Sequence, residues 1–322
     1  MRLALGPFAL LVAAASTVAC SGDPAPPDAR QSEALVGSTT VLASHLAQPG
    51  SVVLDAARVY WTTAGADIGD GAIASVSKLG GTPLTLASHQ RVPFGIAVDD
   101  TRVYWVNYAA GGPGGALMAV SKYGGTPVAL ATSDDGPRTV VVDASRAYFL
   151  TSSAVMAVSK LGGAATNVAG TQCGGGIAQD DANLYWIVNC VMFPPQGIFK
   201  VSKLGGPVVK LSDDAPGAIV VASDGITWMN PDGTVARLSK MGGTAVRVAT
   251  FPSPSSNVLA LDASSFYGVS ASSLVKESRF GGPATPLATG AVGVGAIAVD
   301  ASYVYWTSSG PADARLLRAL KY

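Results

Sequence analysis

The feature that most constrains this chain is a unit that it repeats seven times. The clearest copy reads GIAVDDTRVYW over residues 95–105 and, after a variable stretch, ALMAVSKYGGTPVALATS over residues 116–133. An aromatic pair marks most copies, and successive copies lie 37 to 44 residues apart. The second position of that pair is held by Trp61, Trp105, Phe149, Trp186, Trp228, Gly268 and Trp306. Self-similarity at such a period is the signature of a repeat architecture.

Each unit holds four short apolar or alternating runs, which is the pattern of β-strands. In the second copy these runs cover residues 95–99, 102–108, 116–122 and 126–132. The first two are joined by a tight turn that begins with Asp, and the last two by Lys-Tyr-Gly-Gly, in which glycine supplies the positive φ of a hairpin turn. The sequence therefore predicts an all-β, seven-bladed β-propeller with four antiparallel strands in each blade.

The two ends of the chain predict how the ring closes. The last copy stops at Lys321-Tyr322, where a fourth strand is due, and residues 37–45 match residues 81–89, which hold the fourth strand of the first copy. We therefore expect residues 38–46 to form the outer strand of the last blade, which leaves neither an open ring nor a free strand edge. An open solenoid with capped ends is the alternative.

Two charged positions recur at the short turns. An Asp precedes the aromatic pair in six copies, with Ala222 in the fifth, and a basic residue opens the second turn in all seven. We expect the aspartates to cap their turns and the basic side chains to be solvated, with weak ion pairing. The alternative is a basic ring that docks on an anionic surface, although the interleaved aspartates would cancel most of its field.

The N-terminus has the form of an export signal. Arg2 is followed by an apolar run over residues 3–18 and by Ala19-Cys20, which is the organisation of a secretory signal peptide. Residues 17–20, Thr-Val-Ala-Cys, resemble the bacterial lipoprotein signal, which implies that Cys20 is lipidated. We expect a signal peptide over residues 1–19, a tether over 20–36 and the propeller over 37–322, in an outer-membrane lipoprotein of the bacterial envelope. Plain secretion is the alternative.

The Val-Tyr-Trp-Thr segments resemble the YWTD-repeat β-propellers, including bacterial exported members, and the resemblance covers about residues 37–322. That family usually has six blades, against seven copies here. Its Asp after Trp-Thr is absent from this chain, so no network centred on that Asp is carried over. The resemblance implies a binding platform more often than an enzyme, and fold alone does not establish function.

The two rims of the ring differ in their loops. Short, repetitive turns form one rim, and the long, irregular loops between strands two and three and between blades form the other. Variable loops on a rigid frame are where binding is usually found, so we place the functional face on the long-loop rim. The candidate residues of that face are Asp67, Asp70, Tyr108, Asp134, Asp135, Arg138, Gln179, Phe193, Asp213, Asp214 and Asp232.

The composition argues against several kinds of chemistry. The formal net charge is zero, with only 13% charged residues, so a nucleic-acid surface is not expected. The inner strands are small and apolar apart from Gln179, which disfavours an enzyme, and no catalytic residue is assigned. Loop carboxylates would suit Ca²⁺, but they lack the ordered spacing of a calcium loop. We therefore expect no cofactor, with Ca²⁺ as the open alternative and the metal ligands unknown.

Cys173 and Cys190 flank the first half of the fourth copy, on the same rim and in an oxidising compartment. We predict that they form a disulfide, with two buried thiols as the alternative. The sequence thus favours a lipid-anchored propeller that binds a protein or glycan at the cell envelope through its long-loop rim and meets the membrane only through its anchor. The other possibilities are a metal-assisted lyase or hydrolase with loop carboxylates at the channel mouth, and a structural spacer.

Overall fold

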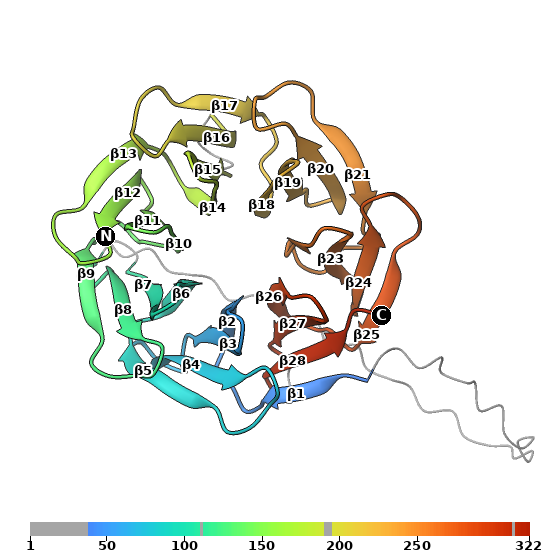
Figure 1. Cartoon of the computed structure of the whole chain (residues 1–322), viewed down its shortest axis with the longest axis horizontal. Coiled ribbons are helices and arrows are strands. Elements are labelled where there is room, and N and C mark those ends of the chain that lie inside the picture. The colour runs from blue at the N-terminus through green and yellow to red at the C-terminus, as the bar shows by residue number, and fades with distance from the viewer. Residues whose placement is uncertain (1–37, 110–111, 190–194, 311–312) are drawn as a thin grey trace, which may run out of the picture. The chain divides into compact units, whose positions relative to one another are not determined.

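The inner strands line a central channel, around which seven four-stranded sheets are arranged in a ring (Figure 1). The structure, a computed structural model, describes residues 38–109, 112–189, 195–310 and 313–322. The predicted signal peptide and tether, with Cys20, lie outside the described residues, as do Cys190 and Phe193. In the part that is described, no helix is long and apolar enough to cross a membrane.

Each blade contributes one strand to each of four concentric positions. The innermost strands are β2 (Pro49–Leu54), β6 (Pro93–Val98), β10 (Thr139–Val142), β14 (Gly174–Gln179), β18 (Ala218–Ala222), β22 (Ala260–Leu261) and β26 (Val294–Val299). The second strands are β3 (Arg58–Thr63), β7 (Arg102–Asn107), β11 (Arg146–Leu150), β15 (Asn183–Val188), β19 (Gly225–Met229), β23 (Ser265–Ser270) and β27 (Tyr303–Ser308).

The two remaining positions complete each sheet. The third strands are β4 (Gly71–Ser77), β8 (Ala116–Ser121), β12 (Ala154–Ser159), β16 (Gly197–Ser202), β20 (Thr234–Leu238), β24 (Ser273–Ser278) and β28 (Arg315–Leu320). The outer strands are β5 (Leu84–Gln90), β9 (Val128–Thr132), β13 (Thr166–Gly170), β17 (Val209–Ser212), β21 (Val246–Thr250), β25 (Thr285–Thr289) and β1 (Thr40–Ala43). We number the blades one to seven from the blade of β2 to that of β26.

The predicted closure is confirmed. Blade seven takes three strands from the C-terminal end of the chain and its outer strand, β1, from the N-terminal end, in the order β1-β28-β27-β26. β1 runs antiparallel to β28, with Thr40 opposite Arg318 and Ala43 opposite Leu316. The pairing joins the two ends of the chain within one sheet, so no blade has to be completed by another molecule.

The hydrophobic core lies between neighbouring blades. The aromatic pairs of the second strands are its largest members: Tyr60, Trp61, Tyr104 and Trp105, for example, are at most 1% exposed. One cluster joins Tyr60 and Ile73 of blade one to Ile96 and Trp105 of blade two. The aromatic positions of the repeat therefore hold adjacent blades together.

The third and fourth strands are joined by the predicted glycine turns. In blade one, Gly80 and Gly81 have φ of 93° and 113°, values that residues with a Cβ rarely adopt. The N–H of Gly80 donates to the carbonyl of Ser77, which closes the turn. The same turn recurs in blades two to six, so that one residue at the tip of each hairpin stands out from the sheet.

Candidate functional site

The short-turn rim carries an unexpected network of charges. The Asp that opens each first turn caps it: Oδ1 of Asp55 accepts the N–H groups of Ala57 and Arg58 at 2.8 and 2.7 Å. Its Oδ2 accepts the hydroxyl of Tyr60. The turn-capping role predicted for these aspartates is thus confirmed.

The basic residues, however, are not solvated, and the expectation that they would be was wrong. Each pairs with the Asp of the preceding blade, and six of the seven side chains are at most 18% exposed. The pairs are Lys78–Asp300, Lys122–Asp55, Lys160–Asp99, Lys203–Asp143, Lys240–Asp180, Arg279–Asp224 and Lys321–Asp262. They form a closed ring that joins every blade to the next, so the recurring charges hold the blades together.

Blade five contributes an ion pair to this ring although it lacks the Asp at the usual turn position. Ala222 stands where the other blades have the turn Asp, and Asp224, two residues later, receives Arg279 and Arg237 instead. The Tyr of the other blades is replaced by Thr227, whose buried hydroxyl has no hydrogen-bond partner among the described residues. The ion pair is therefore preserved in blade five, and the tyrosine hydrogen bond is lost.

The long-loop rim holds the candidate binding residues, and the structure brings three side chains together there. Phe94 is 48% exposed near the start of β6, and its ring centroid lies 5.5 Å from that of Tyr108. The guanidinium of Arg138 lies 5.3 Å from the centre of the Tyr108 ring, and its Nη2 donates to the Tyr108 hydroxyl at 3.4 Å. We call Phe94, Tyr108 and Arg138 the aromatic–arginine cluster.

Backbone hydrogen bonds within blade two and between blades two and three hold this cluster in place. The N–H of Tyr108 donates to the carbonyl of Val92 at 3.1 Å, which sets Tyr108 beside the start of β6. The N–H of Gly95 donates to the carbonyl of Arg138 at 3.0 Å, which aligns the starts of β6 and β10. Gly136 has φ of 57°, and a Cβ there would lie 3.2 Å from the Tyr108 ring. The frame, and not a mobile loop, therefore positions the cluster.

One repeat position, at or just before the start of each inner strand, explains why the cluster lies here. Gly50, Gly175, Gly217 and Gly295 hold that repeat position in four blades, whereas Phe94, Arg138 and Asn257 hold it in the others. The sequence analysis selected Tyr108 and Arg138 but missed Phe94. Comparison of the seven copies at that one position was the signal that could have found it.

A cavity of about 460 Å³ adjoins the cluster between blades seven, one and two. Phe94 and Pro93 form its apolar side, and Ser51, Thr62 and Ser309 bring hydroxyl groups to it. The Thr62 hydroxyl accepts the N–H of Ser51 at 3.1 Å and donates to the carbonyl of Phe94 at 3.3 Å. A mainly apolar cavity with a few hydroxyl groups, beside an aromatic face, is the usual composition of a small-molecule site.

The acidic candidates lie on the same rim but act within their own loops. Asp135 accepts both the N–H and the hydroxyl of Ser153 and the hydroxyl of Thr151. Burial alone would raise the pKa of Asp135, but these hydrogen bonds hold it below its ordinary value. Asp214 accepts the indole N–H of Trp228 at 2.9 Å, and Asp213 pairs with Lys210 at 2.5 Å.

The other four acids are exposed at the surface. Asp134 accepts the N–H of Gly114 at 3.3 Å, and Asp232 accepts the N–H of Thr234 at 2.8 Å and lies in a β-turn. Asp67 and Asp70 belong to the loop between β3 and β4. Over the described residues, no three His, Cys, Asp or Glu side chains gather where they could hold a metal ion. Ca²⁺ stays the alternative to the expectation of no cofactor.

Gln179 does not share the long-loop rim. It ends β14, next to the short turn that begins at Asp180, and its Nε2 donates to the carbonyl of Val142 at 2.6 Å. Its Oε1 is shielded from solvent and has no partner among the described residues. The channel around it is lined by Val, Leu, Ile and Ala side chains and encloses about 440 Å³. Gln179 is therefore a fixed polar group in an apolar channel.

A further cavity of about 330 Å³ lies in blade four, where Trp186, Phe199 and Thr171 line it. Since Cys190 and Phe193 lie outside the described residues, their predicted roles, and the pairing of Cys190 with Cys173, stay predictions.

The sequence matches no protein-family model, and no curated protein matches it either. Solved structures share the fold at low identity. The chain superposes with a TM-score of 0.64 on an oligogalacturonate lyase in complex with manganese, at 12% identity, covering 88% of this chain and 93% of the lyase. A chain of the nidogen/laminin complex gives a TM-score of 0.53 at 16% identity, covering 70% of this chain and 89% of that one.

The extracellular domain of a hybrid two-component system from B. thetaiotaomicron gives a TM-score of 0.65 at 12% identity, covering 89% of this chain and 43% of that protein. At such identities these likenesses establish the propeller fold and nothing finer. Membership of the YWTD-repeat family stays a resemblance of sequence.

Proposed function

We propose that this chain is an exported, lipid-anchored binding protein of the bacterial cell envelope, which takes a protein or glycan on its long-loop rim. The observation that carries the proposal is the aromatic–arginine cluster. Phe94 presents an exposed ring and Arg138 an exposed guanidinium, and no carboxylate is paired with that guanidinium in the described chain. Partly exposed aromatic and arginine side chains on a rigid frame are typical of binding hot spots.

The chemistry of the cluster indicates what it would recognise. A guanidinium forms a planar pair with a carboxylate, and the adjacent rings offer an apolar face for the body of the ligand. The cavity beside Phe94 supplies hydroxyl and backbone groups for further hydrogen bonds. These features favour an elongated ligand that bears carboxylates, either an acidic glycan or an acidic stretch of a protein.

Export and anchoring rest on the N-terminal sequence, because Cys20 lies outside the described residues. The extracellular domain of the two-component system shows that this fold serves outside the membrane in another bacterial protein. Metabolic labelling of cells with an alkyne fatty acid tests the anchor. Label on the wild-type chain that is lost in Cys20→Ser supports it, and an unlabelled, secreted wild-type chain contradicts it.

An oligosaccharide array with neutral and uronic-acid-containing members tests the glycan arm. We expect binding to uronic-acid members that falls at least tenfold in Arg138→Ala and Tyr108→Ala, because each change removes about 1–3 kcal/mol of contact energy. Ile68→Ala, on the same rim and 70% exposed, is the matched control. For the protein arm, a photo-crosslinking residue at position 94 is compared in intact cells with one at Ser145, on the opposite rim.

The proposal fails if neither assay gives a signal that depends on Arg138 or Tyr108. The metal-assisted lyase or hydrolase stays the alternative. The likeness of fold to the manganese-bound lyase supports it. Thermal unfolding with Ca²⁺ or Mn²⁺ and then with excess EDTA tests it. A tightly bound ion at 100 times its Kd adds about 2.7 kcal/mol to the free energy of unfolding, which would raise the midpoint of thermal unfolding by several degrees. Coincident unfolding curves with and without the ion would contradict the metal-assisted enzyme and favour a binding protein without a metal.

A further inference from the structure

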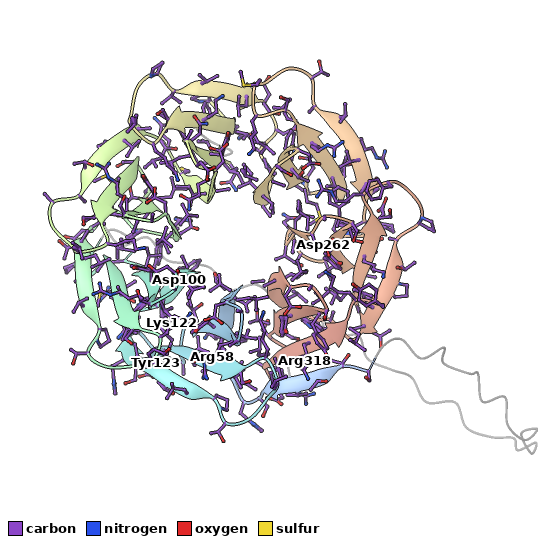
Figure 2. The ribbon with its side chains drawn as sticks, viewed as in Figure 1. Arg58, Asp100, Lys122, Tyr123, Asp262 and Arg318 are labelled. Carbon is purple, nitrogen blue, oxygen red and sulfur yellow. The ribbon has the colours of Figure 1, made fainter. Side chains whose placement is uncertain are left out.

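The tips of the glycine turns carry large apolar side chains that the turns do not need. In each of blades one to six, the residue between the basic residue and Gly-Gly is large, apolar and 87–95% exposed. These residues are Leu79, Tyr123, Leu161, Leu204, Met241 and Phe280. In blade seven, Tyr322 follows Lys321 and is 88% exposed. We call these seven residues the apolar crown of the short-turn rim; Figure 2 labels Tyr123 and Lys122 of blade two.

Local turn chemistry does not account for the crown. In blade one the N–H of Leu79 donates to the Ser77 hydroxyl at 3.1 Å, and the glycines that follow supply the positive φ. Both devices work through the backbone and through Ser77, so a polar residue would fit the tip as well. Exposed apolar residues lower solubility, and contiguous or repeated ones mark a surface that meets something other than water.

The charges beneath the crown are neutralised. Each tip adjoins a basic residue that is already paired with the Asp of the preceding blade, such as Lys78 with Asp300 at 2.9 Å. Three ammonium groups also lie 5.4–5.7 Å from the centres of tyrosine rings. The rim therefore offers apolar tips over a balanced ring of charges, which costs less to dehydrate than unpaired charges would.

The first strand of the described chain begins at this same rim. β28 runs toward the short-turn rim, since Lys321 and Tyr322 of the crown follow it directly. β1 is antiparallel to β28, with Thr40 opposite Arg318, so β1 begins at the short-turn rim and runs away from it. Thr40, at the start of β1, therefore lies at the short-turn rim beside the apolar crown.

We propose that the apolar crown inserts into the interfacial region of a lipid bilayer and sets the propeller on the membrane with its long-loop rim facing away. Separate Leu, Met, Phe and Tyr side chains, one on each turn, suit the boundary between headgroups and acyl chains. A protein partner would instead call for a packed central cluster or pocket. The contact is made by the protein's own side chains and does not depend on a lipid at Cys20 or on the ligand of the opposite rim.

Vesicle co-sedimentation tests this with the chain from residue 20 onward, carrying Cys20→Ser so that no lipid can be attached. The probe is large unilamellar vesicles of phosphatidylethanolamine and phosphatidylglycerol at 3:1, repeated with pure phosphatidylcholine. We expect binding to both, little changed by salt, that falls at least about tenfold when Leu79, Tyr123, Leu161 and Leu204 are all changed to Ser. The variant should stay folded, because these four side chains are 89–95% exposed.

Two controls separate the crown from apolar surface in general. Ile68→Ser removes an exposed apolar residue from the opposite rim and should leave vesicle binding unchanged. Leu161→Trp should show a blue-shifted emission change with vesicles, and Ile68→Trp should not. Absence of wild-type binding to vesicles overturns the proposal. Binding that is unchanged in the variant with four serine substitutions, or that requires anionic lipid, also overturns it. A crown-dependent dimer in sedimentation equilibrium, without vesicle binding, would assign the crown to a second copy of the chain and also overturn it.

Discussion

The ammonium of Lys78 lies 2.9 Å from the carboxylate of Asp300, and this pair joins blade one to blade seven across the point where the ring closes. The same carboxylate caps its own turn through the N–H groups of Ser302 and Tyr303, both at 2.9 Å. It also accepts the Tyr305 hydroxyl at 2.9 Å. Asp300 thus couples a turn, a core aromatic residue and a neighbouring blade.

We expect Asp300→Asn to lower the free energy of unfolding by about 1–3 kcal/mol, because it leaves the largely buried Lys78 without a counter-charge and weakens the hydrogen bonds that Asp300 accepts. Urea unfolding followed by tryptophan fluorescence measures this. A double-mutant cycle with Lys78→Met isolates the pair, and we expect a coupling energy of about 1 kcal/mol. A coupling energy near zero would show that Asp300 acts only as a turn cap. Asp134→Asn, in an exposed loop, is the control.

The ring of carboxylates predicts a steep loss of stability in acid. Burial alone would raise the pKa of Asp300, but hydrogen bonds from Lys78, two backbone N–H groups and Tyr305 outweigh it and lower the pKa to about 2. The same balance lowers the pKa of Asp55, Asp143 and Asp180 to about 2, and it lowers those of Asp99 and Asp262 also.

Since these groups bind protons more weakly in the folded state than in the unfolded state, their contribution is complete above the ordinary pKa of 3.8 and is lost as the pH falls toward 2. We expect the free energy of unfolding to be nearly flat from pH 7 to 5 and to fall steeply between pH 4 and 2. Urea titrations at each pH measure the slope, and Asp300→Asn should make it shallower. A curve that is flat down to pH 2 would contradict the pairing.

The repeat made the fold and the closure predictable because both depend on spacing within the chain. The ion-pair ring was not predictable in the same way. The sequence offers Lys122 two possible partners, Asp99 in its own blade and Asp55 in the preceding blade. Only the packing of one blade against the next decides which of the two it pairs with. The sequence analysis expected weak, solvated pairing within a blade, and the structure places the partner in the preceding blade.

The candidate site was predicted in part, for a similar reason. Tyr108 and Arg138 stand out as large side chains in irregular loops, but Phe94 belongs to an apolar strand, where a core role is the default. Only the ring geometry brings the start of β6 next to the start of β10. Gln179 was grouped with the loop residues by its polarity, whereas the direction of β14 carries it to the other end of the channel.

The predicted disulfide between Cys173 and Cys190 gives a direct chemical test. Denatured, unreduced protein should show neither residue as a free thiol, and mild reduction should lower the free energy of unfolding by roughly 3 kcal/mol, as expected for a closed loop of about 17 residues. Cys173→Ser and Cys190→Ser should each reproduce the loss, and the double variant should be no less stable than either one. Thiol labelling at both positions of the native, unreduced protein would contradict the bridge.

Two buried threonines at related positions should respond in opposite ways to the same change. Thr227 in blade five is fully buried, and its hydroxyl has no partner among the described residues. Thr62 in blade one is equally buried, but its hydroxyl accepts the N–H of Ser51 and donates to the carbonyl of Phe94. Thr→Val removes the hydroxyl and leaves a side chain of nearly the same shape, so each variant reports what its own hydroxyl contributes.

We expect Thr227→Val to raise the free energy of unfolding by about 1 kcal/mol, because it removes a dehydrated polar group that gains nothing in return. Thr62→Val should lower the free energy of unfolding by about 1–3 kcal/mol, because it leaves the N–H of Ser51 and the carbonyl of Phe94 without their partner. It should also disturb the cavity beside Phe94 and weaken ligand binding there, which Thr227→Val should not. Destabilisation of similar size in both variants would mean that the Thr227 hydroxyl has a partner, and it would contradict the hydrogen-bond loss described for blade five.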